Sequence, residues 1–370
     1  NAGTGGAVSF NGAVGSSAVP MGAMTLSNAG SFTFAGDVYG ASLTTAAQPY
    51  DLALTGGTLS VGGATSFGNT GSLQLGAGAG TSTLTFTGGV SVNGSTSVRV
   101  AGTLNTSNAA MNLGTSALTL LADTTLGAGS GAVTLGGTVD SFDNTTAYGL
   151  VVNSTGATTF GGVVGDTHPL SSVTTNSGGT LLMNGGVVTT TGTQSYNEAI
   201  TLGTGTTLTA TGVTFGAAVS GAHALTVKGT TAINGNTVNT GTAAQHYMGA
   251  VTLTGATTLT MADSGKTFFL ALAGGFTVTL PANAAALGFN ARFIAKVSST
   301  TAYILAAATG DTMIGWPSNI GGADSVADGN AAGDQLNFVA NTALAGDMAE
   351  VFGDGTSLHV RAHKAERDGA

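Results

Sequence analysis

Apolar and polar residues alternate along most of this chain in short runs. Between residues 61 and 150 the apolar members lie two positions apart. A period of two places apolar side chains on one face of a β-strand and polar ones on the other. Helical spacing is not sustained there, so the pattern predicts a series of short strands, in which the apolar pairs are Leu84/Phe86, Val90/Val92, Val98/Val100, Leu118/Leu120 and Val133/Leu135.

Glycine, asparagine and serine interrupt these runs every five to ten residues. The dipeptide Asn93-Gly94 is a strong signal for a tight turn. Threonine, valine, isoleucine and phenylalanine fill the intervals, and they suit a pleated, half-buried surface. The chain therefore reads as many strands joined by sharp corners.

Longer phrases also recur. The phrase QSYNEAITL at residues 194–202 returns as AQHYMGAVTL at residues 244–253, and LLMNGGVVTT at 181–190 returns as AINGNTVNT at 232–240. A fixed repeat period is the signature of a repeat architecture. No single unit can bury its apolar face alone, so successive coils must stack around a shared interior. We predict an all-β chain in which residues 1–265 form a β-solenoid, a rod that resembles a parallel β-helix.

The character of the chain changes after Met261. The strand-like apolar runs become longer and contain more aromatic residues. In addition, 9 of the 17 acidic and 6 of the 8 basic residues lie at or after Lys266. We predict a small C-terminal β-domain over residues 266–363, which caps the rod and mediates self-association, and a loose tail over residues 364–370. Its expected strands lie at residues 291–297, 302–305, 335–339, 348–352 and 358–361, with a helical turn or loop at 284–290.

The central repeats resemble those of large filamentous-haemagglutinin-like bacterial surface proteins. The phrases that carry the resemblance lie at residues 158–175 (TTFGGVVGDTHPLSSVTT), 189–215 and 221–227 (GAHALTV). The resemblance implies a right-handed β-helix that is exported and acts as an adhesin or surface filament. A secretion domain of the two-partner type is not recognisable in this sequence.

The C-terminal part resembles a small β-domain at the ends of phage and marine-virus surface proteins. The resemblance rests on residues 276–297, 309–316 (TGDTMIGW) and 332–362. It implies a virion fibre, spike or capsid-decoration protein, often assembled as a trimer. The two resemblances agree on an extracellular structural protein and differ on whether a virus or a bacterium makes it.

The charge and composition of the chain exclude several classes of binding partner. The net charge is −9, only 7% of residues are charged, and Arg99 is the one basic residue before Lys228. A nucleic-acid reader needs a stripe of Lys and Arg, so we expect no nucleic-acid binding. There is no cysteine, which excludes disulfides and thiolate metal sites. No run of 18 apolar residues predicts a membrane span. Because the sequence begins at Asn1 without Met, we interpret it as processed or excerpted from a longer polypeptide.

Candidate catalytic groups are sparse. The histidines, any of which could belong to a hydrolase triad, are interpreted as structural or exposed; they are His168, His223, His246, His359 and His363. Asp140 and Asp143 are the only close acidic pair in the rod and could form a retaining glycosidase pair, but an acidic turn is the preferred interpretation. We predict no catalytic residues and no enzymatic activity.

Candidate ligand sites are equally weak. The glycine triplets Gly76/Gly78/Gly80 and Gly127/Gly129/Gly131 lack the lysine of a phosphate loop and are expected to be turns. An acidic set could hold calcium or could simply form turns; it comprises Asp324, Asp328, Asp334, Asp347 and Asp354. No cofactor is predicted, and no metal beyond this calcium alternative. Trp316, Phe338, Phe352 and Leu358 could form a binding patch, although a core or a subunit interface is preferred.

These observations favour a virion surface fibre, spike or decoration protein that acts in assembly and host attachment. The alternatives are a secreted bacterial adhesin or filament protein and a β-helix that cleaves or binds polysaccharide, which would need a charged or aromatic groove on one flank. The expected partners are copies of the chain itself and a host-cell or virion surface. The low charge of the rod supports contact between copies.

Overall fold

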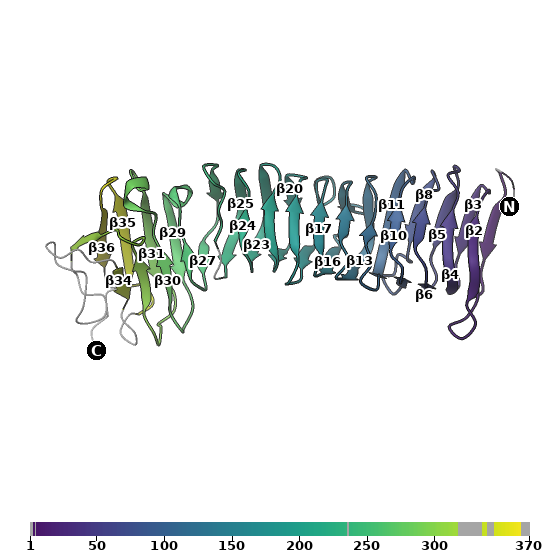
Figure 1. Ribbon diagram of the computed structural model, residues 1–370, viewed down its shortest axis with the longest axis horizontal. Coiled ribbons are helices and arrows are strands. Elements are labelled where there is room, and N and C mark those ends of the chain that lie inside the picture. The colour runs from purple at the N-terminus through teal and green to yellow at the C-terminus, as the bar shows by residue number, and fades with distance from the viewer. Residues whose placement is uncertain (1–2, 4, 235–236, 317–334, 339–343, 364–370) are drawn as a thin grey trace. The chain divides into compact units, whose positions relative to one another are not determined.

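The computed structural model describes residues 3, 5–234, 237–316, 335–338 and 344–363. The protein is all-β, with 52% strand and 2% helix, and it forms a β-solenoid of about 14 turns (Figure 1). This confirms the predicted fold class. The chain divides into two compact units, residues 1–211 and 212–370, with the boundary inside the strand β23.

The first unit contains the strands up to the first half of β23. Their bounds are β1 Ala7–Phe10, β2 Met21–Leu26, β3 Ser31–Phe34, β4 Val38–Thr45, β5 Asp51–Leu54, β6 Thr58–Val61, β7 Thr65–Phe67, β8 Ser72–Leu75, β9 Thr83–Phe86, β10 Val90–Val92, β11 Ser97–Asn105, β12 Met111–Asn112, β13 Leu118–Gly129, β14 Val133–Leu135, β15 Val139–Ser141, β16 Gly149–Ser154, β17 Ala157–Phe160, β18 Ser172–Thr175, β19 Thr180–Met183, β20 Val187–Thr189, β21 Thr193–Tyr196, β22 Ala199–Leu202 and β23 Thr206–Phe215.

The second unit contains the remaining strands and two short 3-10 helices. Their bounds are β24 Val219–Ser220, β25 Leu225–Ile233, β26 Gln245–Tyr247, β27 Val251–Leu253, β28 Thr257–Thr258, η1 Met261–Asp263, β29 Lys266–Leu270, β30 Phe276–Thr279, η2 Asn283–Ala285, β31 Asn290–Ala295, β32 Tyr303–Ala306, β33 Met313–Trp316, β34 Gln335–Phe338, β35 Met348–Gly353 and β36 Leu358–His363.

Strands of the first unit pair in parallel with strands one coil away, so that each inward side chain lies on its equivalent in the next coil. One interior column runs through Val8, Phe32, Leu52, Leu73, Val98, Leu118, Val139, Val164, Val188 and Leu208. Every member after Val8 is at least 96% buried. Full burial of such a side chain contributes about 1.5–3 kcal/mol, so the columns supply most of the stability of each coil.

Two further columns lie in the interior of this unit. One passes through Leu59, Leu84, Leu104, Leu126, Val152, Thr175 and Tyr196. The other passes through Thr65, Val90, Met111, Val133, Thr158, Leu181 and Ile200. The long strands β11 and β13 each contribute residues to two columns. A register shift between Val100 and Gly102 bends β11 at a corner, so its two halves lie in different columns.

The repeated phrases occupy equivalent interior positions. In the first copy Tyr196 donates its hydroxyl to Gln194 Oε1 at 3.0 Å, and Gln194 Nε2 donates to the carbonyl of Val188 at 3.0 Å. In the second copy Tyr247 donates to Gln245 Oε1 at 3.0 Å, and Gln245 Nε2 donates to a backbone carbonyl at 2.9 Å. The repeat in sequence is therefore a repeated polar link inside the coil, where an unpaired amide would be costly.

In the second unit the parallel stacking continues past the predicted domain boundary at 265/266. Val251 of β27, Phe268 of β29 and Phe293 of β31 stack in register. The first antiparallel pair follows only at β31 with β35, and β35 then pairs antiparallel with β36. The domain division at this position stays a prediction, whereas the five expected C-terminal strands are confirmed as β31, β32, β34, β35 and β36.

A second sheet of this unit contains β28, β30, β32 and β34. It turns an aromatic row inward, with the rings of Phe276 and Tyr303 5.2 Å apart and those of Tyr303 and Phe338 6.4 Å apart. The expected helical turn is present as η2, and the predicted tail over residues 364–370 lies outside the described residues.

Glycine at some corners is required by the neighbouring coil. A Cβ on Gly185 would collide with the carbonyl group of Gly162, and one on Gly162 would collide with Gly137. At Gly205, in the corresponding corner of the next coil, a Cβ would meet no atom within 4 Å. Backbone approach between coils, rather than a special φ angle, therefore selects glycine at residue 185.

We expect Gly185→Ala to lower the free energy of unfolding by about 1–3 kcal/mol, because an added methyl group must displace backbone of the adjacent coil. Gly205→Ala serves as the matched control and should change stability by less than about 0.5 kcal/mol. Urea unfolding followed by circular dichroism measures both. Equal midpoints for the two variants would contradict this explanation of the corner.

Glu198 is an acidic side chain in the interior of the first unit. It is 1% exposed, and neither carboxyl oxygen makes a hydrogen bond of ordinary geometry within the described residues. Burial raises the pKa of Glu198 from 4.5 to about 7, and the Thr175 hydroxyl opposes this shift only in part. The folded protein therefore binds a proton that the unfolded chain releases at lower pH.

This raised pKa predicts that the first unit loses stability as pH rises from about 4.5 to above about 7. The stabilising contribution of the protonated carboxyl is complete below pH 4.5 and is gone above the folded pKa, a change of roughly 3 kcal/mol. Urea midpoints at pH 4.5, 6 and 8 measure it. Glu198→Gln should remove most of this pH dependence, whereas Asp166→Asn, which changes an exposed carboxylate, should preserve it.

Candidate functional site

The first unit has a hollow on its surface, which we name the flank hollow. Its volume is about 360 Å³, and it is lined by Arg99, Ala117, Thr119, Thr138, Asp140, Ser141, Phe142, Thr167 and His168. Most of these residues lie in β11, β13 and β15 or directly beside the last two strands, whereas Thr167 and His168 belong to the loop between β17 and β18. The flank hollow is therefore assembled from segments that are separated in the sequence.

Register explains why Arg99 and Asp140 lie on the same wall. Arg99 of β11 pairs with Thr119 of β13, which pairs in turn with Asp140 of β15. Each of these residues follows an inward side chain, so all of them point outward. Neighbouring strands are about 4.8 Å apart, so the Arg99 side chain lies on one side of Thr119 and the Asp140 side chain lies on the other.

Part of the lining of the flank hollow comes from segments that leave the regular coil. Phe142 follows β15 and is 49% exposed, and the Arg99 guanidinium lies 5.8 Å from the centre of its ring. The loop that carries Thr167 and His168 is fixed from below, because Asp140 Oδ1 accepts the backbone N–H groups of both residues at 3.1 Å. The backbone N–H of Ser141 also donates to the carbonyl of His168 at 3.1 Å, so two residues of β15 position this segment.

Serine, histidine and aspartate meet in this hollow without forming a catalytic triad. Ser141 is fully buried, and its hydroxyl donates to the carbonyl of Pro169 at 2.9 Å and accepts the N–H of Tyr148 at 3.0 Å. Asp140 binds backbone N–H groups rather than an imidazole. A nucleophile needs an available hydroxyl beside a base, and this serine is occupied on both sides.

The acidic pair Asp140 and Asp143 also behaves as loop-forming residues. Asp143 Oδ1 accepts the hydroxyl of Thr145 at 2.7 Å and the N–H groups of Thr145 and Thr146 at 2.8 and 3.0 Å. These bonds, the Thr145 hydroxyl first, hold the pKa of Asp143 below its usual range. A glycosidase acid needs a raised pKa, so this carboxylate suits a turn better than proton donation.

The second unit presents a different surface, which we name the charged sheet face. It consists of outward residues on β31, β33, β35 and β36: Arg292, Ile314, Glu350, Phe352, His359 and Arg361. Glu350 pairs across the sheet with Arg292 on one side and with Arg361 on the other. The next row along the strands holds Ile314, His359 and Phe352.

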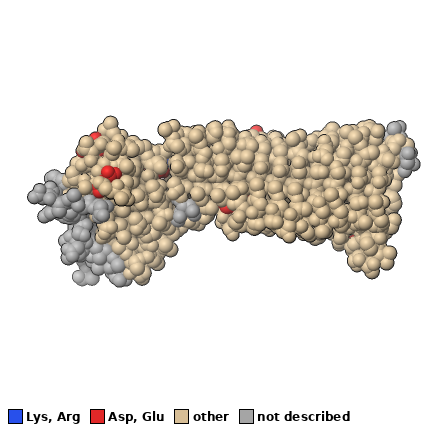
Figure 2. Space-filling view, viewed as in Figure 1, with Lys and Arg blue, Asp and Glu red and all other residues tan. Residues whose placement is uncertain are grey.

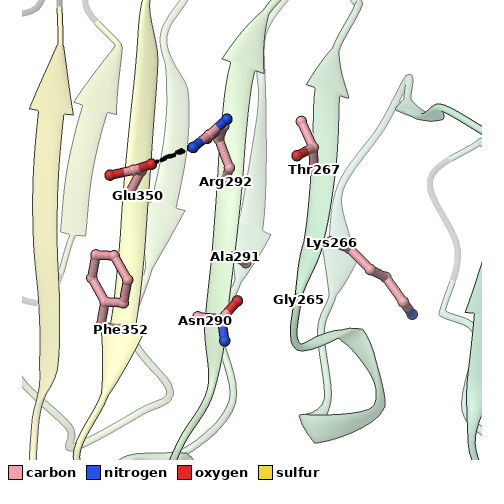
Figure 3. A pocket seen from close by; sticks show the side chains of 8 residues that line it. All are labelled: Gly265, Lys266, Thr267, Asn290, Ala291, Arg292, Glu350 and Phe352. Carbon is pink, nitrogen blue, oxygen red and sulfur yellow. Dashed lines mark hydrogen bonds and ion pairs between the residues drawn. The ribbon is translucent and has the colours of Figure 1, made fainter.

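Figure 3 shows the part of this face around Phe352, where a hollow of about 300 Å³ opens between β29, β31 and β35. Arg292 donates from Nη2 to Glu350 Oε1 at 2.7 Å and from Nε at 3.1 Å. The Lys266 side chain points away from this hollow and binds Asp263 Oδ1 at 2.8 Å. On the other side of Phe352, a second hollow of about 170 Å³ is lined by Ile314, His359, Val360 and Arg361.

The acidic residues of the calcium alternative are only partly described. Asp324, Asp328 and Asp334 lie outside the described residues. Asp347 accepts the N–H of Leu344 at 3.0 Å, and Asp354 accepts those of Thr356 and Ser357. Asp354 also lies 2.8 Å from His359 Nε2, and this contact, with the bonds from Thr356 and Ser357, holds its pKa well below the usual range. Among the described residues, no three His, Cys, Asp or Glu side chains are grouped to hold a metal ion.

The other singled-out residues have separate roles. Phe338 and Leu358 are fully buried in the core, whereas Phe352 is 45% exposed. Trp316 ends β33, and its side chain lies outside the described set. His223 and His246 are exposed in the second unit, and His363 Nε2 lies 4.0 Å from Glu350 Oε2.

The sequence analysis did not select Phe142, Arg292 or Ile314. A signal was present for Phe142, because the segment SFDNTTAY that contains it interrupts the alternation of apolar and polar residues.

The glycine triplets differ from expectation in one respect. Gly76 and Gly80 take positive φ angles in the turn after β8, as predicted. Gly127 lies within β13 instead, so the prediction of a turn was wrong for this residue. The physical reason is a register shift between Gly127 and Gly129, which lets the strand bend without leaving the sheet. Gly129 ends the strand with a positive φ angle, and the N–H of Gly131 donates to the carbonyl of Ala128 at 2.9 Å, which confirms a turn for these two glycines.

No protein-family model, curated protein or solved structure matches this chain. In the described part of the chain, no helix has the length and hydropathy needed to cross a membrane. The face drawn in Figure 2 shows a few acidic residues among mainly uncharged side chains. The flank hollow and the charged sheet face each combine charged residues with an exposed phenylalanine.

The contacts of Asp140 predict a local effect of its removal. Asp140→Ala should raise the hydrogen-exchange rates of the Thr167 and His168 amides by about ten- to a hundredfold, because each loses a charge-assisted bond of about 1.5–3 kcal/mol. Asp143→Ala is the matched control and should affect only the Thr145 and Thr146 amides. Amide exchange read by NMR distinguishes them; unchanged exchange at residues 167 and 168 would show that the carboxylate does not hold this loop.

Proposed function

We propose that this chain is an extracellular structural protein, a virion surface fibre, spike or decoration protein that acts in assembly and host attachment. The observation that carries the proposal is the contrast between the solenoid coils and the charged sheet face. The outward positions of the coils are mostly hydroxyl-bearing and uncharged, whereas the charged sheet face combines exposed apolar side chains with charges.

The charged sheet face has the composition of a protein interface. Phe352 is 45% exposed and Ile314 is 39% exposed, and they lie in the row beside Arg361, Glu350 and Arg292. Aromatic residues and arginine are enriched at the centres of interfaces. Within the described residues, the Arg361 guanidinium has no carboxylate partner, so its donors are available to a second protein.

The self-complementary charges favour another copy of the chain as one partner. Arginine and glutamate alternate across the face, so a second copy in a suitable register can place its Glu350 against Arg361. A secreted bacterial adhesin or filament protein of the filamentous-haemagglutinin type would use the same surfaces. It remains the alternative, and capsid genes or an exporter beside the gene would distinguish the two.

The proposal predicts that the full chain is a homo-oligomer whose contacts include Phe352. Phe352→Asp should weaken assembly by about 2 kcal/mol per interface, roughly thirtyfold, because it places a charge in an apolar contact. Sedimentation velocity over a concentration series measures the change.

Leu182→Asp is the control, because it alters an equally accessible apolar residue, 36% exposed, in the first unit. It should leave the oligomer intact. A monomeric wild-type chain at all concentrations, or equal weakening by both variants, would overturn the assignment of the charged sheet face as the contact.

A further inference from the structure

We propose that the flank hollow binds a neutral saccharide, with a sugar ring stacked on Phe142 and its hydroxyl groups bound by Arg99 and Asp140. The site deepens the proposed role in attachment, since it gives the chemical class of the molecule that is recognised. It is separate from the charged sheet face, because all its residues belong to the first unit. The two proposals can therefore fail independently.

Phe142 supplies the apolar surface. The residue is 49% exposed, and within the described residues its ring contacts the Arg99 guanidinium. Phe10, the other exposed phenylalanine of this unit, instead stacks on Phe34 at 4.6 Å. The guanidinium lies over one side of the Phe142 ring. A half-exposed aromatic ring beside polar groups suits a ligand with one apolar face and a polar edge, which is the character of a pyranose ring.

Arg99 supplies hydrogen-bond donors. It is the only Lys or Arg in residues 1–227, so its position at this hollow is not a consequence of general surface charge. Within the described residues, no protein group accepts a hydrogen bond from its guanidinium, although its charge contributes to lowering the pKa of Asp51. A guanidinium has five donors in a fixed fork, which can bind two neighbouring hydroxyl oxygens at once.

Asp140 supplies the acceptor. The Oδ1 atom of Asp140 accepts hydrogen bonds from the N–H groups of Thr167 and His168, and these bonds fix the orientation of the carboxylate. In the described part of the chain, the Oδ2 atom of Asp140 accepts no hydrogen bond, so it can accept one from a hydroxyl group of a ligand. Thr119 and Thr138 add hydroxyl groups to the same wall. A donor, an oriented acceptor and an aromatic ring thus line one hollow.

Charge and size favour a small neutral sugar over other ligands. Asp140 and the neighbouring Asp143 oppose phosphates and acidic sugars, since only one cation stands beside them and the chain carries a net charge of −9. The volume of about 360 Å³ is near the lower end of ligand pockets, which span about 300–1,000 Å³. It accommodates about one or two sugar rings, with the weak, millimolar affinity of a shallow site.

Saturation-transfer-difference NMR on the full chain tests the inference. The probes are glucose, galactose, mannose and N-acetylglucosamine with their neutral disaccharides, and the acidic probes are galacturonic acid and N-acetylneuraminic acid. We expect transfer to the C–H protons of at least one neutral sugar. Phe142→Ala and Arg99→Gln should each weaken its binding by about tenfold or more.

Phe352→Ala is the matched control, because it removes the exposed phenylalanine of the charged sheet face and should leave sugar binding unchanged. Thermal melting by circular dichroism confirms that each variant folds. Absence of transfer to every neutral sugar, binding of acidic sugars only, or equal binding by wild type and Phe142→Ala would overturn the assignment. Sedimentation of Phe142→Ala should show an unchanged oligomer, so a failure of sugar binding is distinguishable from a failure of the assembly proposal.

Discussion

The parallel hydrogen bonding between successive coils is the constraint on which this structure depends. It holds neighbouring backbones about 4.8 Å apart, so a side chain cannot choose its neighbours freely but meets the equivalent residue of the next coil. An apolar residue at one level therefore requires an apolar residue at the next, which is what the column from Phe32 to Leu208 shows. The same spacing leaves no room for a Cβ at corners such as Gly162.

Polar groups can enter such an interior only when the coil itself satisfies them. Gln194 does so, because its amide donates to the carbonyls of Val188 and Thr209 and accepts from Tyr196. Glu198 lies two residues beyond Tyr196 and has no comparable set of donors. The contrast shows why the repeat conserves the glutamine–tyrosine pair in its second copy, whereas Gly249 stands at the position that corresponds to Glu198.

The alternation of apolar residues was sufficient to predict the class of fold and most C-terminal strands, because both depend on local pattern. The flank hollow could not be predicted in the same way. Arg99 and Asp140 are far apart in sequence, and they share a wall only because β11, β13 and β15 fall in one register column. That register depends on the length of each coil, which varies: Leu73 and Val98, for example, are partners 25 residues apart, whereas Val98 and Leu118 are partners 20 residues apart.

The parallel stacking gives way to antiparallel pairing at β31, and charged residues lie on the strands that pair there. A parallel stack can always add another coil, so its last strand presents unpaired backbone groups that invite further pairing. In the second unit β35 covers β31 in antiparallel fashion, and β36 and β33 extend that sheet. Outward positions there no longer belong to a repeating column, so they are free to carry arginine and glutamate in a defined order. Among the described residues, Arg292, Glu350 and Arg361 thus lie on the strands at which the parallel stack gives way to antiparallel pairing.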